Sequence, residues 1–149
     1  MHRLFAGSMH NFSVRVSDWF LGGMLLAYGS VILFFPATFA ESRVISVLVR
    51  IAPVYMIGYV CFAIGGMRVL ALTVNGSFPS FRWSPHVRLL MCLLSCFVWF
   101  QFVLGAMFSG PSSMAIVIYP FLFLFDIYNT FLTASEAGIA ERVHRNGPA

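Results

Sequence analysis

The stretch LLMCLLSCFVWFQFVLGAMF spans residues 89–108, and after the link SGPSS the chain continues with MAIVIYPFLFLFDIYNTFLT over residues 114–133. An α-helix needs about 20 mostly apolar residues to cross a hydrocarbon core roughly 30 Å thick, and both stretches meet that length. The link leaves room only for a tight turn, which is typical of two antiparallel neighbouring helices. These residues therefore predict a transmembrane helical hairpin.

Two further segments satisfy the same test. The segment WFLGGMLLAYGSVILFFPATFA covers residues 19–40, with Pro36 near its far end, and another apolar segment covers residues 51–74. Proline is tolerated in the first turn of a helix, so Pro53 is compatible with this start. A helix over residues 44–66 is the alternative frame.

The sequence thus predicts an all-α fold, an integral membrane four-helix bundle in which successive helices run up, down, up and down. The expected organisation is a cytoplasmic N-terminal arm over residues 1–18, a transmembrane domain over 19–133 and a cytoplasmic tail over 134–149.

Composition argues against a soluble domain and against a nucleic-acid-binding protein. The chain is 60% hydrophobic and 9% charged, whereas soluble domains are roughly 45–50% apolar and about 25% charged. Its mean hydropathy is +0.88. The nine basic residues are all arginines, and they are too scattered to form a nucleic-acid surface. The expected partner is therefore a lipid bilayer.

The placement of the arginines predicts the orientation, because cytoplasmic segments carry an excess of positive charge. The arm, the tail and the second link with its flanks hold seven arginines, whereas the opposite side holds only Arg43 and Arg50. Both chain ends and the link 75–88 are therefore expected on the cytoplasmic side of a bacterial inner (plasma) membrane. The alternative is a signal peptide cleaved after Ala40, which would leave three helices.

Arg68 and Asp126 are the ionisable residues deepest within the expected spans. Each lies roughly 9–10 Å below the cytoplasmic boundary, so the two side chains are expected at one depth. We expect an Arg68–Asp126 ion pair, with Asn129 adding a hydrogen bond one turn away. In the alternatives, Arg68 extends to the headgroups while Asp126 lacks a specific partner, or Asp126 belongs to a proton relay. Gln101 is expected to bond another helix.

The link between the second and third spans mixes aromatic and basic side chains: Phe78, Phe81, Arg82, Trp83 and Arg88. This composition favours anchoring in the headgroup layer of an anionic leaflet. Docking of a protein partner is the alternative, because loops often carry function.

The sequence predicts no catalytic residue, no cofactor and no metal site. The four histidines lie outside the expected spans, which argues against haem within the bundle. The chain also lacks HExxH, paired CxxC and glycine-rich phosphate motifs. The three cysteines fall in apolar segments and are expected to be packing residues: Cys61, Cys92 and Cys96.

Residues 65–99 carry an arginine near a helix end (Arg68), an Asn75-Gly76 turn, Ser84-Pro85 followed by Arg88, and Trp99. In these features the stretch resembles the central part of small uncharacterised four-helix membrane proteins of bacteriophages and prophages. The resemblance covers about a quarter of the chain. It implies a phage-related inner-membrane protein and carries over no activity.

The function expected from the sequence is therefore that of a non-catalytic inner-membrane protein. It would act by self-association, as a homo-oligomer, or as an accessory of a membrane-protein complex. One alternative is a holin-like, pore-forming protein, and another is a small transporter subunit built around Arg68, Asp126 and Asn129.

Overall fold

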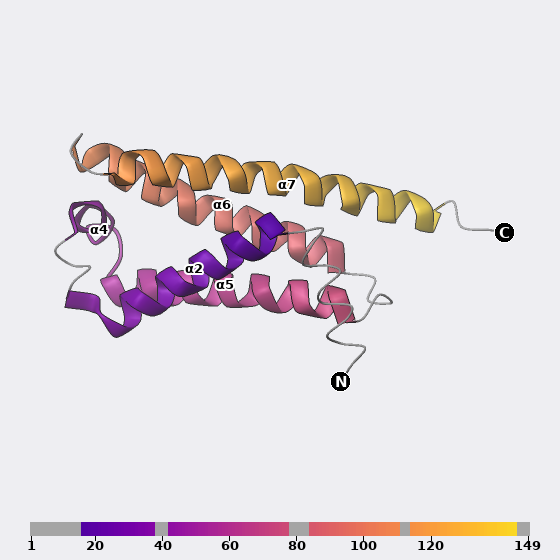
Figure 1. Cartoon of the computed structure of the whole chain (residues 1–149), viewed down its shortest axis with the longest axis horizontal. Coiled ribbons are helices and arrows are strands. Elements are labelled where there is room, and N and C mark those ends of the chain that lie inside the picture. Colours follow the sequence, from indigo (N-terminus) through magenta and orange to yellow (C-terminus); the bar gives the residue numbers. More distant parts are fainter. Residues whose placement is uncertain (1–15, 38–41, 78–83, 111–113, 146–149) are drawn as a thin grey trace.

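A computed structural model describes residues 16–37, 42–77, 84–110 and 114–145. It contains helices α2 (Val16–Phe34), α4 (Arg43–Leu48), α5 (Val54–Ser77), α6 (Ser84–Phe108) and α7 (Ala115–Arg145), as Figure 1 shows. No strand occurs among these residues, so the all-α prediction is confirmed for them.

Four of the helices are long and apolar enough to cross a membrane, which indicates a multi-pass membrane protein. Their candidate spans are Val16–Phe34, Val54–Val74, His86–Phe108 and Ala115–Ile139. Each overlaps one of the segments expected from hydropathy; the ends at residues 74 and 108 coincide, and the other ends are shifted by one to six residues.

The long helices form two antiparallel pairs. Helix α2 packs most extensively against α5, and α6 against α7; we call these the first and second hairpins. Successive helices run in alternating directions, and the start of α2 and the end of α7 both point away from the end where α4 lies (Figure 1). The hairpins meet mainly through α5 and α6.

Glycines bring the backbones of the first hairpin into direct contact. A Cβ atom added at Gly29 would lie 2.3 Å from the backbone nitrogen of Phe62, and one at Gly65 would lie 2.3 Å from that of Leu26. Lipid is as apolar as a leucine side chain, so helices in a membrane gain most from such close packing of small residues. The glycines therefore make α2 and α5 a single tightly packed unit.

The link between the first two spans differs most from expectation. Helix α2 ends at Phe34, because a residue that precedes a proline is disfavoured in the helical conformation and Pro36 follows Phe35. Residues 43–48 form the unexpected short helix α4, whose apolar face packs on α6 beside Gly105. The chain leaves the helix between Leu48 and Val54, which excludes one continuous helix over residues 44–66.

The middle of the bundle is filled by four rings, which we call the aromatic core: Tyr28, Trp99, Phe102 and Tyr119. Tyr28 contacts Phe102 edge-on at 5.1 Å between centroids, and Trp99 stacks on Tyr119 at 6.3 Å. The hydroxyl groups of Tyr28 and Tyr119 are hydrogen-bonded. Rings from α2, α6 and α7 thus join the two hairpins through shape and one polar contact.

Candidate functional site

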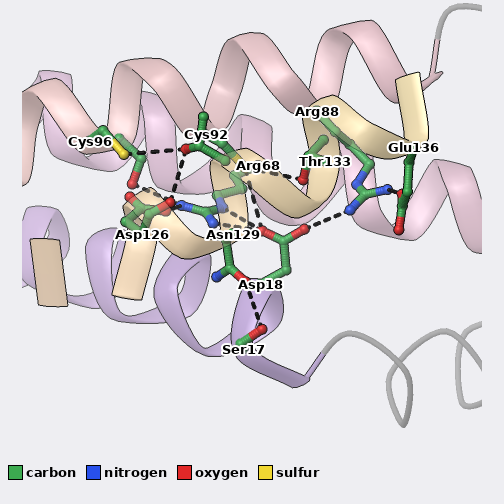
Figure 2. Close-up of polar contacts among 12 residues, drawn as sticks. Ser17, Asp18, Arg68, Arg88, Cys92, Cys96, Asp126, Asn129, Thr133 and Glu136 are labelled. Carbon is green, nitrogen blue, oxygen red and sulfur yellow. Dashed lines mark hydrogen bonds and ion pairs between the residues drawn. The ribbon is translucent and has the colours of Figure 1, made fainter. Parts of the chain in front are cut away.

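Arg68 of α5 and Asp18 of α2 form the ion pair at the centre of the site (Figure 2). Arg68 donates from Nε and Nη2 to Asp18 Oδ1, at 3.0 and 2.6 Å. The arginine is 1% exposed and the aspartate 4%. Gly22, one turn after Asp18, leaves room for the arginine, since a Cβ atom there would lie 3.3 Å from Arg68 Cγ. The first hairpin therefore contains its own neutral pair.

The same guanidinium group extends to the second hairpin. Arg68 Nη1 donates to Asp126 Oδ1 of α7 at 2.6 Å and to Ser95 Oγ of α6 at 2.9 Å. Asp126 is fully buried. One side chain thus contacts all three of the other long helices.

A second arginine binds the other oxygen of Asp18. Arg88 of α6 donates from Nη2 to Asp18 Oδ2 at 2.9 Å and from Nη1 to Glu136 Oε2 of α7 at 2.8 Å. The Arg88 side chain is 4% exposed, whereas that of Glu136 is 39% exposed. We call Asp18, Arg68, Arg88, Asp126 and Glu136 the charged cluster; it begins deep in the bundle and ends near its surface.

Helical periodicity explains why these groups meet. Residues three, four or seven apart share a helix face, and α6 places Arg88, Cys92 and Ser95 on one such face. On α7, Asp126 shares a face with Asn129, Thr133 and Glu136. Smaller polar groups complete the contacts: Ser17 Oγ donates to Asn129 Oδ1 at 2.8 Å, and Cys92 Sγ lies 3.6 Å from Asp18 Oδ1.

The charged cluster holds every charged residue of the four candidate spans. It combines three carboxylates with two guanidinium groups. Burying an ion costs several kcal/mol, and removing one partner of a buried pair destabilises a protein by about 3–5 kcal/mol. The members of the cluster therefore depend on one another for their counter-charges.

Three buried atoms in this region have no hydrogen-bond partner among the described residues: Arg88 Nε, Asp126 Oδ2 and Asn129 Nδ2. Two of them lie on one face of α7, beside the guanidinium of Arg68. Buried polar atoms without partners are uncommon in folded proteins, so each is a position at which a small polar molecule would be stabilised, and Asp126 Oδ2 could also accept a proton.

The structure brings together some of the residues singled out in the sequence and separates others. Arg68 and Asp126 are in contact, and Arg68 does not extend to the exterior. Asn129 does not bond Asp126; its partner is Ser17 of α2. Arg88, placed by the sequence in an interface loop, lies within α6 and is buried because Asp18 and Glu136 neutralise it. Its proposed loop partners Phe78, Phe81, Arg82 and Trp83 lie outside the described residues.

Sequence reasoning missed Asp18, Ser95 and Glu136. The expected cytoplasmic arm over residues 1–18 includes Asp18, but this residue lies two residues inside α2, at the end of the bundle where Arg68 lies. Glu136 follows Asn129 by seven residues, which is close to two helical turns, so the spacing alone places these two on one face.

No group of three or more histidine, cysteine, aspartate or glutamate side chains that could hold a metal ion occurs within the described part of the chain. The sequence matches no known protein family, no curated protein and no solved structure.

Proposed function

We propose that this protein is an integral membrane protein that acts by association within the bilayer, without catalysis and without forming a pore. The observation that carries the proposal is that the charged side chains of the spans point toward one another and not toward the outside of the bundle. All five charged residues of the spans pair with one another, and four of them are buried inside the bundle. A charge in contact with lipid is costly, and the charged cluster removes that cost.

The outer faces of the spans complement this interior. Their exposed residues are apolar or glycine, apart from three tyrosines and the residues Thr73, His86 and Ser135. A water-filled pore between copies of the chain would need a polar outward face on at least one helix. The apolar exterior favours lipid and helix contacts over the holin-like alternative.

Helix α7 offers a surface for association. Phe121, Phe125 and Tyr128 form a row of exposed rings along it, with centroids 6.2 and 6.4 Å apart between neighbours. Of the four spans, α7 is the least covered by the rest of the bundle. Large rings with few rotatable bonds suit a helix–helix interface, so we propose this aromatic row as the contact with another membrane helix.

The association is tested by energy transfer between labelled copies in liposomes, over a range of protein-to-lipid ratios. We expect transfer above the level for randomly distributed molecules, and a large loss in the variant Phe121→Ala/Phe125→Ala. The matched control is Phe20→Ala/Phe62→Ala, which removes two exposed rings from the first hairpin. Random-level transfer at every ratio would contradict self-association.

The proposed orientation places the charged cluster near the cytoplasmic face. Arg68 and Arg88 are neutralised in the cluster, so they no longer count as topological signals. Five arginines then remain on the proposed inner side against two on the outer side, and the sign of the bias is unchanged. Fusions after residues 80, 112 and 149 test this: green fluorescent protein should be active at the first and last, alkaline phosphatase only at residue 112.

The pore-forming alternative has a direct test. Inducible expression in a bacterium is followed by optical density and by uptake of a membrane-impermeant dye. We expect continued growth and dye exclusion. Abrupt lysis or leakage after induction would replace the proposal with a holin-like function.

A small transporter subunit is the second candidate, favoured by the buried unpartnered atoms Asp126 Oδ2 and Asn129 Nδ2. They lie beside an ion pair within the spans, where transport sites occur. Proton or solute flux into liposomes that is present in the native protein and absent in Asp126→Asn would support it. Equal flux in protein-free liposomes would exclude it.

A further inference from the structure

A cavity of about 280 Å³ lies between α5 and α6, beside α4 and the turn that follows it. Its floor is formed by buried side chains of three elements: Leu48, Cys61, Val98 and Phe102. Ligand cavities are usually about 300–1,000 Å³, so this one can hold a single ring with a few attached carbons.

The rim of the cavity consists of residues on the outer surface of the bundle. Met56 and Val60 of α5 and Phe97 of α6 line it and are 58%, 44% and 63% exposed. All three lie within candidate spans, so under the proposed membrane insertion the cavity opens to lipid. A molecule that enters it must therefore be dissolved in the bilayer.

Among the described residues that line the cavity, Gln101 supplies the only side-chain amide. It was expected to bond another helix, but it makes no hydrogen bond with any described residue. It lies seven residues before the end of α6 at Phe108, which places it roughly 10 Å below the helix end. A polar group at that depth has no water to bond, so the amide favours a ligand that carries an oxygen.

The depth of Gln101 distinguishes two kinds of occupant. The ester oxygens of phospholipids lie at the edge of the hydrocarbon, so an acyl chain in the cavity would leave the amide unpaired. A lipophilic ring with its own carbonyl oxygen would reach it. We propose that the cavity binds a membrane-soluble carbonyl compound of the quinone type, with the Gln101 amide donating to a ring carbonyl.

Thermal unfolding of the purified full chain in detergent tests this, because a ligand that binds only the folded state raises the midpoint. The probes are decylubiquinone and decylbenzene, which lacks oxygen. We expect a saturable increase with decylubiquinone and a smaller one with decylbenzene. In Gln101→Leu the concentration for half-saturation should rise about 3- to 10-fold, as the loss of one neutral hydrogen bond predicts.

Two further variants distinguish the contribution of the Gln101 amide to binding from the contribution of the cavity volume. Val60→Phe fills the mouth of the cavity and should abolish the response to decylubiquinone, whereas Leu94→Phe, an exposed α6 residue outside the lining, should leave it unchanged. Partition into the micelle is the same for all variants and cancels in their comparison. The Gln101→Leu variant replaces an unpaired amide with an apolar side chain and should fold normally.

Equal responses of the native protein and Gln101→Leu would overturn the proposal, and so would equal responses to the two probes. The inference rests on membrane insertion but not on association through α7. Carbonate extraction of native membranes tests insertion separately: a chain released by carbonate ends both proposals, whereas a retained chain without quinone binding ends only this one.

Discussion

The charged cluster and the aromatic core both join the two hairpins, but they do so by different physical means. The cluster uses directional contacts between opposite charges, and each side chain has partners that no other group replaces. The aromatic core uses ring contacts from α2, α6 and α7, which tolerate small shifts. Among the hydrogen bonds of the described residues, only the one from Arg68 to Asp126 links α5 to α7. The comparison indicates that charge specifies which helices pair, while the rings fill the space between them.

The largest effect should follow from Arg68→Leu. The substitution leaves Asp18 and Asp126 buried without their main counter-charge, so we expect the free energy of unfolding to fall by about 3–5 kcal/mol. Folded yield and unfolding by denaturant in detergent measure it. Arg142→Leu, an exposed arginine on α7, is the matched control and should be close to neutral. If Arg68→Leu has the same free energy of unfolding as the native protein, the charged cluster does not hold the two hairpins together.

The next largest effect is expected for Asp126→Asn. The amide oxygen still accepts from Arg68, but the charge is lost, and a hydrogen bond to a charged group contributes roughly 1.5–3 kcal/mol. The loss in unfolding free energy should fall within that range and below the loss in Arg68→Leu. Glu141→Gln on the exposed part of α7 controls for the change of charge. A loss as large as that of Arg68→Leu would show that the charge of Asp126 outweighs its hydrogen bond.

Tyr119→Phe tests the aromatic core. The ring contacts with Trp99 and Phe102 remain and only the hydroxyl bond to Tyr28 is removed, so we expect a loss of about 0.5–1.5 kcal/mol. The same unfolding assay measures it, with Tyr59→Phe at an exposed position as the control. If Tyr119→Phe lowers the free energy of unfolding more than Asp126→Asn does, the conclusion that the charged cluster specifies the pairing while the aromatic core only fills space is wrong.

The smallest effect should come from Ser17→Ala, which removes the bond from α2 to Asn129 of α7. Interhelical hydrogen bonds in membrane proteins average about 0.6 kcal/mol, and we expect a loss of that order. Ser135→Ala on the exposed face of α7 is the matched variant. An effect above that of Tyr119→Phe would assign Asn129 a larger part in joining the hairpins than its single described bond supports.

Much of the fold was predictable, because the length and hydropathy of a membrane span are local properties. The four long helices follow from runs of apolar residues, and the Arg68–Asp126 contact followed from counting depth along two helices. Helix α4 was not predictable in the same way. Its residues become helical against α6, beside Gly105, and that contact depends on how the chain folds back.

The further partners of Arg68 and Asp126 were less predictable than the contact between these two residues. Asp18 lies near the start of α2 and Glu136 near the end of the last candidate span, where a charge is ordinarily solvated, so nothing local marks them as members of the charged cluster. The bond between Ser17 and Asn129 joins residues 112 positions apart and depends on how α2 crosses α7. Such contacts follow from the relative placement of the two hairpins, which no single segment encodes.

Because Arg68 and Asp18 belong to the same hairpin, insertion during synthesis, under the proposed topology, would bring the aspartate into the membrane before the arginine. Asp18 emerges from the ribosome before Arg68, whereas Asp126 follows it by 58 residues. An arginine at the centre of an inserting helix costs about 2.5–3.5 kcal/mol on translocon scales, and Arg68, nearer the end of its span, would cost less than that. In that order of insertion, the guanidinium would meet a counter-ion as soon as its own helix is made, and the later helices would be added to a pair that is already neutral.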